Sequence, residues 1–170
     1  MTQKTQSYSQ TTDTPALVLE GGGFRGMFTS GVLDVLMERG LTGFSSVWGV
    51  SAGAMNAVSF KSGQIGRTMR IMLAYRDDKR FMSYLSFAKT GDIAGGEFVY
   101  ETVQEELDPC DNDAFEENPM PMYAVVSNVT FGTPDYLRIR KLPDDAVKVR
   151  ASASLPGVSR TLLIDGQRYL

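Results

Sequence analysis

The sequence predicts an α/β fold in which helices cover a parallel sheet. Residues 16–20 and 45–50 are short apolar runs of the kind that form buried strands. Each run ends at a glycine-containing loop, and a segment with helical character follows each of them, over residues 25–39 and 51–60. This β-α-β-α alternation is typical of a parallel sheet with helices packed on it.

The two helices are predicted from different features. Apolar side chains recur at helical spacing from Phe28 to Leu36 within residues 25–39, and Gly40 follows as a stop signal. Residues 51–60 are mostly small, so this second helix is expected to approach the sheet closely.

The middle of the chain is harder to interpret. Residues 65–75 and 98–107 have mixed helical character, and the acidic, proline-containing residues 105–121 are typical of a solvated connection. Several large side chains gather before and within the segment between the two helices, and we expect them to pack in the core rather than line an acyl-chain channel or form a lid. They are Met69, Met72, Phe81, Met82, Tyr84, Leu85 and Phe87.

The last third predicts strands and one helix. Residues 122–131 read as a strand, residues 132–135 as a turn and residues 136–142 as a partner strand. Residues 144–155 predict a short helix capped by its aspartates. Two strand-like runs within residues 160–170 flank Asp165-Gly166, a strong signal for a two-residue hairpin.

Length and composition indicate one soluble domain over residues 16–170, preceded by a disordered polar tail over residues 1–15. The 170 residues are 42% hydrophobic and 22% charged. With 17 Lys and Arg against 20 Asp and Glu and no basic block, nucleic acid is not an expected partner. There is no secretory signal and no stretch near the roughly 18 apolar residues of a membrane span. We therefore expect a cytoplasmic protein, which is compatible with peripheral work at a membrane. The single cysteine, Cys110, is interpreted as incidental.

Residues 20–26, Glu-Gly-Gly-Gly-Phe-Arg-Gly, match the Gly-x-Gly-x-x-Gly pattern between a strand and a helix. A dinucleotide site would need an acidic residue about 20 positions later, and none occurs between Glu38 and Asp77. A phosphate-binding P-loop fails because Met27 follows Gly26. The glycines could simply form a tight turn. Alternatively, their N–H groups at a helix N-terminus could receive the oxyanion of an acyl-transfer reaction.

Ser51 lies in a Gly-x-Ser-x-Gly pattern between Gly49 and Gly53. In many hydrolases this spacing holds a nucleophilic serine at a tight strand-to-helix turn. Because Ser51 ends the strand that follows the glycine loop, parallel pairing would bring both loops to the same edge of the sheet. A helix N-cap is the simpler interpretation of this serine. The chain contains no histidine, so the usual base of a catalytic triad is absent.

The segment from Leu17 to Leu41 and the Gly49–Val58 segment together resemble the patatin-like phospholipase family, whose motifs are Gly-Gly-Gly-x-Arg-Gly and Gly-x-Ser-x-Gly. Weaker similarity extends through residues 125–137 to residues 149–158, which resemble the family's Ala-Ser-x-x-x-Pro segment. The resemblance implies a three-layer α/β/α fold with a mostly parallel central sheet, and acyl-ester hydrolysis by a Ser-Asp dyad without histidine.

Specific roles follow from the same resemblance. Ser51 would be the nucleophile, the backbone of Gly22 and Gly23 would bind the oxyanion, and Arg25 would brace that loop or add positive charge. Arg25 could instead be a solvated residue of the first helical turn. The remaining motif glycines are Gly21, Gly26, Gly49 and Gly53. The expected substrate is a phospholipid or another lipid ester, with no cofactor and no metal.

The family's catalytic aspartate lies in an Asp-Gly-Gly or Asp-Gly-Ala motif just after a hairpin. Here Gln167 follows Asp165-Gly166, which departs from that motif and favours a hairpin turn. We therefore expect a domain that is incomplete at its C-terminus, with its catalytic aspartate following Leu170. Two alternatives remain at this stage. One is a catalytically silent lipid- or protein-binding module with the same fold, and the other is a nucleotide-binding Rossmann domain.

Overall fold

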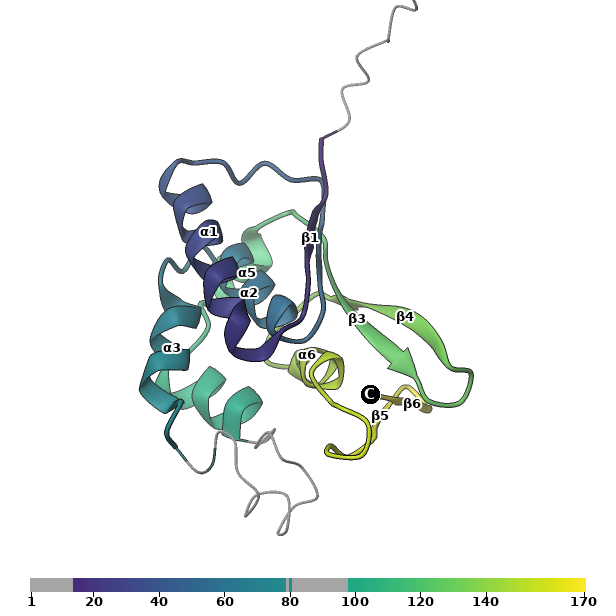
Figure 1. The fold of residues 1–170 in the computed structure, drawn as a ribbon. Coiled ribbons are helices and arrows are strands. Elements are labelled where there is room, and N and C mark those ends of the chain that lie inside the picture. Colours follow the sequence, from purple (N-terminus) through teal and green to yellow (C-terminus); the bar gives the residue numbers. More distant parts are fainter. Residues whose placement is uncertain (1–13, 79, 81–97) are drawn as a thin grey trace, which may run out of the picture.

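A six-stranded mixed sheet organises the fold, in the order β1-β2-β3-β6-β5 with β4 also paired to β3 (Figure 1). The computed structural model describes residues 14–78, 80 and 98–170, so the predicted tail over residues 1–15 lies almost wholly outside it. The strands are β1 (Leu17–Leu19), β2 (Val47–Gly49), β3 (Met122–Asn128), β4 (Thr133–Ile139), β5 (Leu162–Ile164) and β6 (Gln167–Tyr169).

The pairing of β1 with β2 is parallel, as the sequence predicts, and β2 also pairs parallel with β3. Leu19 lies opposite Gly49, which lies opposite Ala124. Strand β4 pairs antiparallel along the whole of β3, so β2 and β6 must share the other edge of β3. Strand β2 occupies the first part of that edge, and antiparallel β6 reaches the last part at Asn128.

The helices gather on one face of the sheet (Figure 1). They are the 3₁₀-helix η1 (Gly23–Arg25), α1 (Gly26–Glu38), α2 (Ala52–Lys61), α3 (Arg67–Tyr75), the π-helix η2 (Phe98–Leu107), α5 (Asn112–Glu117) and α6 (Ala146–Ser152). On the opposite face Trp48 stacks on Tyr123, and Val18 is 74% exposed. Within the described ranges, no helix is both long and apolar enough to cross a bilayer.

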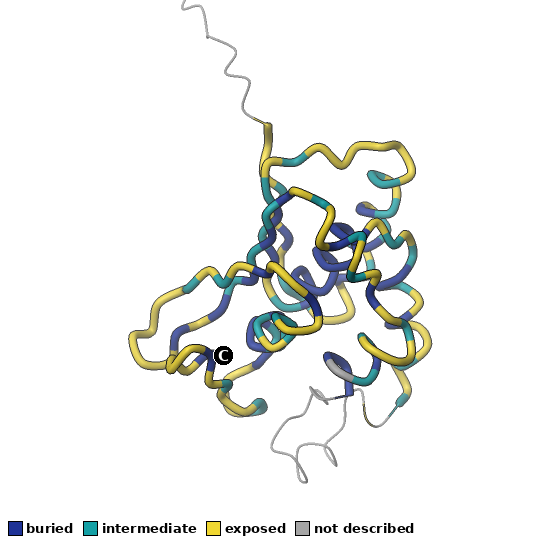
Figure 2. Tube along the Cα trace, turned by 180° about the vertical axis from the view of Figure 1, so that it is seen from behind, coloured by how far each residue is buried: buried dark blue, intermediate teal, exposed yellow. Residues whose placement is uncertain are grey.

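Helix α2 forms the centre of the core, and every one of its residues is buried (Figure 2). Its first turn lies so close to the strands that two glycines are required. A Cβ atom on Gly53 would lie 2.4 Å from the carbonyl oxygen of Leu19, and one on Gly49 would lie 2.5 Å from Cα of Ala54. This agrees with the close approach expected from its small residues.

The segment over residues 105–121 differs from the solvated connection that its acidic composition predicts. It contains α5, whose Phe115 is fully buried, and Lys61 at the end of α2 lies 4.6 Å from the centre of that ring. Asn118 donates from its side chain to the carbonyl oxygen of Lys61 at 2.9 Å. A single buried aromatic residue is too short a pattern to reveal such packing from the sequence.

The structure also bears on the predicted aspartate cap and on the predicted apolar group. Asp145 is the N-cap residue of α6, but its carboxylate accepts from the N–H groups of Arg140 and Lys141 rather than from the helix. Met72 is buried in the core as expected, whereas residues 81–87 of the proposed apolar group lie outside the described residues.

The predicted hairpin at the end of the chain is confirmed. Strands β5 and β6 pair antiparallel, with Ile164 opposite Gln167. Asp165 and Gly166 both have positive φ, 48° and 78°, which is the combination that a two-residue type I′ turn requires. Asp165 is exposed at this turn.

We expect Gly53→Ala to destabilise the fold by about 3 kcal/mol or more, because the new methyl group would meet backbone atoms that cannot move aside. Urea unfolding followed by circular dichroism measures the effect. The matched control is Gly31→Ala in α1, where a Cβ atom meets nothing within 4 Å and alanine should add up to about 1 kcal/mol. Equal stability of the two variants would contradict the close approach of α2.

Candidate active site

Ser51 lies at the sharp turn between β2 and α2. Its backbone has φ 53° and ψ −120°, and apart from Asp165 it is the only non-glycine residue with positive φ in the described part of the chain. Such a conformation is strained for a residue with a side chain and persists only where the surrounding structure imposes it. The close packing of Gly49 and Gly53 imposes it here. The sharp strand-to-helix turn predicted at Ser51 is therefore present in backbone geometry.

The glycine loop after β1 lies directly against this elbow. A Cβ atom on Gly21 would be 3.1 Å from Cβ of Ser51, and one on Gly26 would be 3.0 Å from Cβ of Ala52. Parallel pairing of β1 with β2 thus brings the two predicted loops to one edge of the sheet, as expected. A Cβ atom at either position would be in tight contact, so a side chain there would require its neighbour to shift by a few tenths of an ångström.

Gly22 is the N-cap residue of η1 and Gly23 is its first residue, a place where backbone N–H groups have no partner within the helix. Gly23 has φ +54°, a conformation that glycine adopts readily. In the described part of the chain, no carbonyl oxygen or side chain accepts from the N–H of either residue. Two donors are therefore left available beside Ser51.

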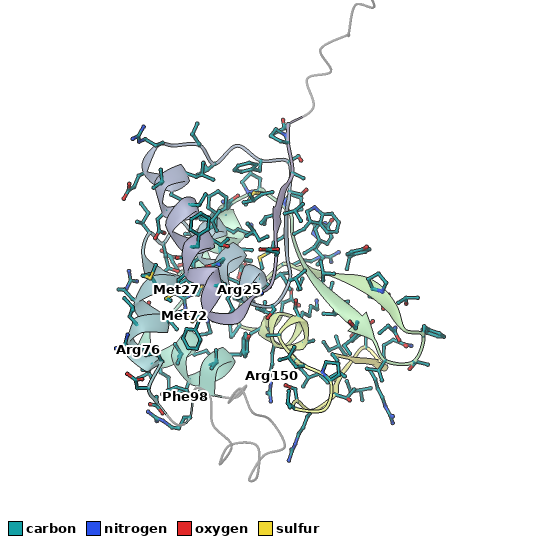
Figure 3. All side chains as sticks on the ribbon, viewed as in Figure 1. Arg25, Met27, Met72, Arg76, Phe98 and Arg150 are labelled. Carbon is teal, nitrogen blue, oxygen red and sulfur yellow. The ribbon has the colours of Figure 1, made fainter. Side chains whose placement is uncertain are left out.

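Arg25 ends η1 and is exposed (Figure 3). Its guanidinium lies over the loop, with Nε 3.3 Å from where a Cβ atom of Gly22 would be. Among the residues that the structure describes, no carboxylate forms an ion pair with Arg25. The charge is thus placed next to the loop, with no ion-pair partner among the described residues.

A long-range hydrogen bond that sequence reasoning missed fixes the backbone of Ser51. The N–H of Ser51 donates to Oγ of Ser152 at 2.9 Å, and that hydroxyl donates to the carbonyl oxygen of Val125 at 2.6 Å. Ser152 ends α6, so one side chain links the elbow, the helix and β3. The Ala-Ser pair at residues 151–152 marked this position in the sequence without indicating what it does.

The side-chain hydroxyl of Ser51 forms no hydrogen bond with any described residue. Asp165, the aspartate of the Asp-Gly pair, lies at the β5–β6 turn. The structure brings a candidate nucleophile and the glycine loop together, and among the described residues no carboxylate is hydrogen-bonded to the side chain of Ser51.

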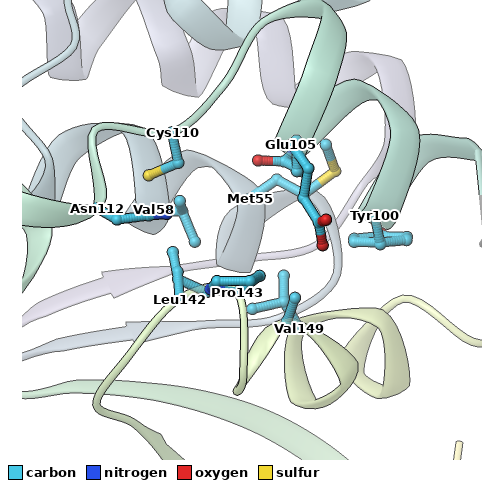
Figure 4. A pocket seen from close by; sticks show the side chains of 11 residues that line it. Met55, Val58, Tyr100, Glu105, Cys110, Asn112, Leu142, Pro143 and Val149 are labelled. Carbon is cyan, nitrogen blue, oxygen red and sulfur yellow. The ribbon is translucent and has the colours of Figure 1, made fainter.

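A cavity of about 30 Å³ lies between α2, η2 and α6 (Figure 4). Met55 and Val149 line it, one helical turn from Ser51 and Ser152 respectively. Cys110 also lines the cavity, and burial raises the pKa of its thiol, which does not favour a nucleophilic role.

Comparisons with known proteins agree with this geometry. The family model described as patatin-like phospholipase matches residues 17–170. The uncharacterized protein YjjU of Escherichia coli K12 is 30% identical over 159 residues, covering 91% of this chain and 44% of the relative. The crystal structure of VipD from Legionella pneumophila has a similar fold, with a TM-score of 0.65 at 15% identity, covering 92% of this chain and 45% of VipD.

The chain thus spans less than half the length of either relative. A family match across residues 17–170 excludes the alternative of a Rossmann dinucleotide-binding domain, and the α/β fold agrees with it. The chain belongs to the patatin-like phospholipase family.

Proposed function

We propose that this chain carries the nucleophile and oxyanion hole of a serine hydrolase that cleaves acyl esters of phospholipids or related lipids. One observation carries the proposal. The strained elbow presents the unbonded hydroxyl of Ser51 beside a loop whose Gly22 and Gly23 N–H groups have no acceptor in the described structure. Acyl transfer needs both parts, a free nucleophile and preorganised donors for the developing negative charge.

The reaction would proceed in two steps. Oγ of Ser51 attacks the ester carbonyl carbon while its proton passes to a carboxylate base, and the resulting oxyanion accepts from the N–H groups of Gly22 and Gly23. Collapse of this intermediate breaks the ester bond, and the leaving alcohol takes the proton. Water then attacks the acyl-serine in the same way, which releases the fatty acid and restores Ser51. Arg25 adds positive charge beside the oxyanion.

The direction of β6 supports a base that follows Leu170. Leu170 is hydrogen-bonded to Ser127 through both backbone groups, at 2.6 and 3.0 Å. Since β6 runs antiparallel to β3, a continuing chain heads from Ser127 towards Val125. The carbonyl oxygen of Val125 is already bonded to Ser152, the residue that holds the N–H of Ser51. The next few residues, at about 3.3 Å each, would therefore leave β3 beside Ser51.

Ser51→Ala, made in a natural chain that extends beyond Leu170, should reduce hydrolysis of p-nitrophenyl esters by about a thousandfold or more. Covalent labelling by a fluorophosphonate probe should be lost as well, because no other serine in the described structure has the elbow conformation. Ser154→Ala, at a serine whose hydroxyl bonds within its own helix end, is the matched control and should label normally. Unchanged activity in Ser51→Ala would refute the nucleophile.

The 170-residue chain alone should be nearly inactive, and restoring the downstream sequence should raise ester hydrolysis by about a hundred- to ten-thousandfold, the usual contribution of a positioned base. We expect an Asp-Gly-Gly or Asp-Gly-Ala sequence within a few residues of Leu170. If the 170-residue chain hydrolyses esters at the full rate and loses that rate in Asp165→Asn, then Asp165 is the base and this proposal for β6 is wrong.

A catalytically silent lipid- or protein-binding module is the alternative that the same experiments address. Such a module would show neither labelling of Ser51 nor a gain of activity in the longer chain. In that case the strained turn at Ser51 would be part of the fold without a catalytic role.

A further inference from the structure

Asn56 is a polar residue in the middle of the buried helix α2 and is only 1% exposed. Its side-chain Nδ2 donates to the carbonyl oxygen of Gly26 at 2.9 Å. Gly26 is the last glycine of the loop after β1, and α2 begins directly after Ser51. One hydrogen bond therefore connects the nucleophile's helix to the loop that carries Gly22 and Gly23.

The other half of the Asn56 amide is unsatisfied. Its Oδ1 is buried and has no hydrogen-bond partner among the described residues. A buried acceptor without a donor destabilises a fold, so this amide is a poor choice for stability alone. The bond to Gly26 is also not needed to satisfy that carbonyl, because helix geometry already supplies the N–H of the residue four positions later.

We propose that Asn56 is a positioning residue that holds the glycine loop at the distance from Ser51 that acyl transfer requires. The inference rests on the proposed function, and it assigns to Asn56 a role in catalysis rather than in folding. The contacts between Gly26 and α2 support this role of Asn56. A Cβ atom on Gly26 would lie 3.4 Å from Nδ2 of Asn56 and 3.0 Å from Cβ of Ala52, so the loop meets α2 at these two points. Without the amide bond, the contact with Ala52 is the one that remains at Gly26 itself.

The test is Asn56→Leu in the natural chain that extends beyond Leu170, because leucine has a similar volume and lacks both polar groups. We expect a melting temperature within about 4 °C of the parent. Backbone amide exchange in residues 20–26, followed by hydrogen-deuterium exchange and mass spectrometry, should become at least about tenfold faster. Ester hydrolysis should lose about tenfold to a hundredfold in kcat with KM changed less than twofold, since misplaced donors affect the transition state more than binding.

Ser59→Ala is the matched control on the same helix. Its hydroxyl bonds to Thr68 in α3 at 2.9 Å and has no contact with the loop. This variant should lower the melting temperature while leaving loop exchange and kcat unchanged. If Asn56→Leu folds poorly, Asn56→Ala removes the same bond without steric overlap and is scored by the same measurements.

The proposal is overturned if either Asn56 variant leaves exchange in residues 20–26 at the parent rate, or if exchange increases while kcat of an active parent stays constant. The exchange measurement needs no activity. A parent that hydrolyses no ester would therefore contradict the proposed function, while faster loop exchange would still support the physical link between Asn56 and the loop.

Discussion

The contact between the first turn of α2 and the ends of β1 and β2 is the constraint on which the other features of the site depend. Gly53 packs against the carbonyl oxygen of Leu19 at a distance that excludes any side chain. Because α2 must start there, the chain reverses at Ser51 with a positive φ. The same closeness makes position 21 tight, since a Cβ atom there would lie 3.1 Å from Cβ of Ser51, and it places the loop against the serine. The contact that packs α2 against the sheet therefore also sets the positions of Ser51 and the glycine loop.

The second organising feature is a discontinuity along one edge of β3. Strand β2 pairs with its first three residues and β6 reaches Asn128, with Val125 lying between these contacts. In an unbroken sheet the carbonyl oxygen of Val125 would bond to a neighbouring strand. Here Ser152 bonds to it and uses its own oxygen to hold the N–H of Ser51. The break in the sheet is therefore what allows α6 to reach the elbow.

Local features of the chain could be predicted from the sequence, and long-range ones could not. The glycine loop, the elbow and the Asp165-Gly166 turn each depend on backbone conformations that a few adjacent residues require, so a short pattern identifies them. Burial of Phe115 in an acidic segment depends on what α5 packs against, which no short pattern contains. The bond from Ser51 to Ser152 joins residues 101 positions apart.

Asn56 lies between these two cases. It is a lone amide in the sequence of α2, but no sequence pattern singled it out, because its partner, Gly26, lies 30 positions away. Its role could be inferred only from the fold. The same holds for Ser152, which lies in a recognisable Ala-Ser pair whose contact with the elbow no spacing rule predicts.

A carboxylate base, as proposed here, would give these restraints their importance in the mechanism. A carboxylate with a pKa near 4 is a weaker base than imidazole towards a serine hydroxyl, so proton removal alone activates Ser51 less than in a triad. More of the barrier must then be lowered by donors that are already in place when the oxyanion forms. Donors on a glycine-rich loop are in place only if the loop is held, because glycine has the largest conformational freedom of all residues. In such a site an amide that fixes the loop would serve the proposed reaction even though it leaves the side-chain oxygen of Asn56 unpaired.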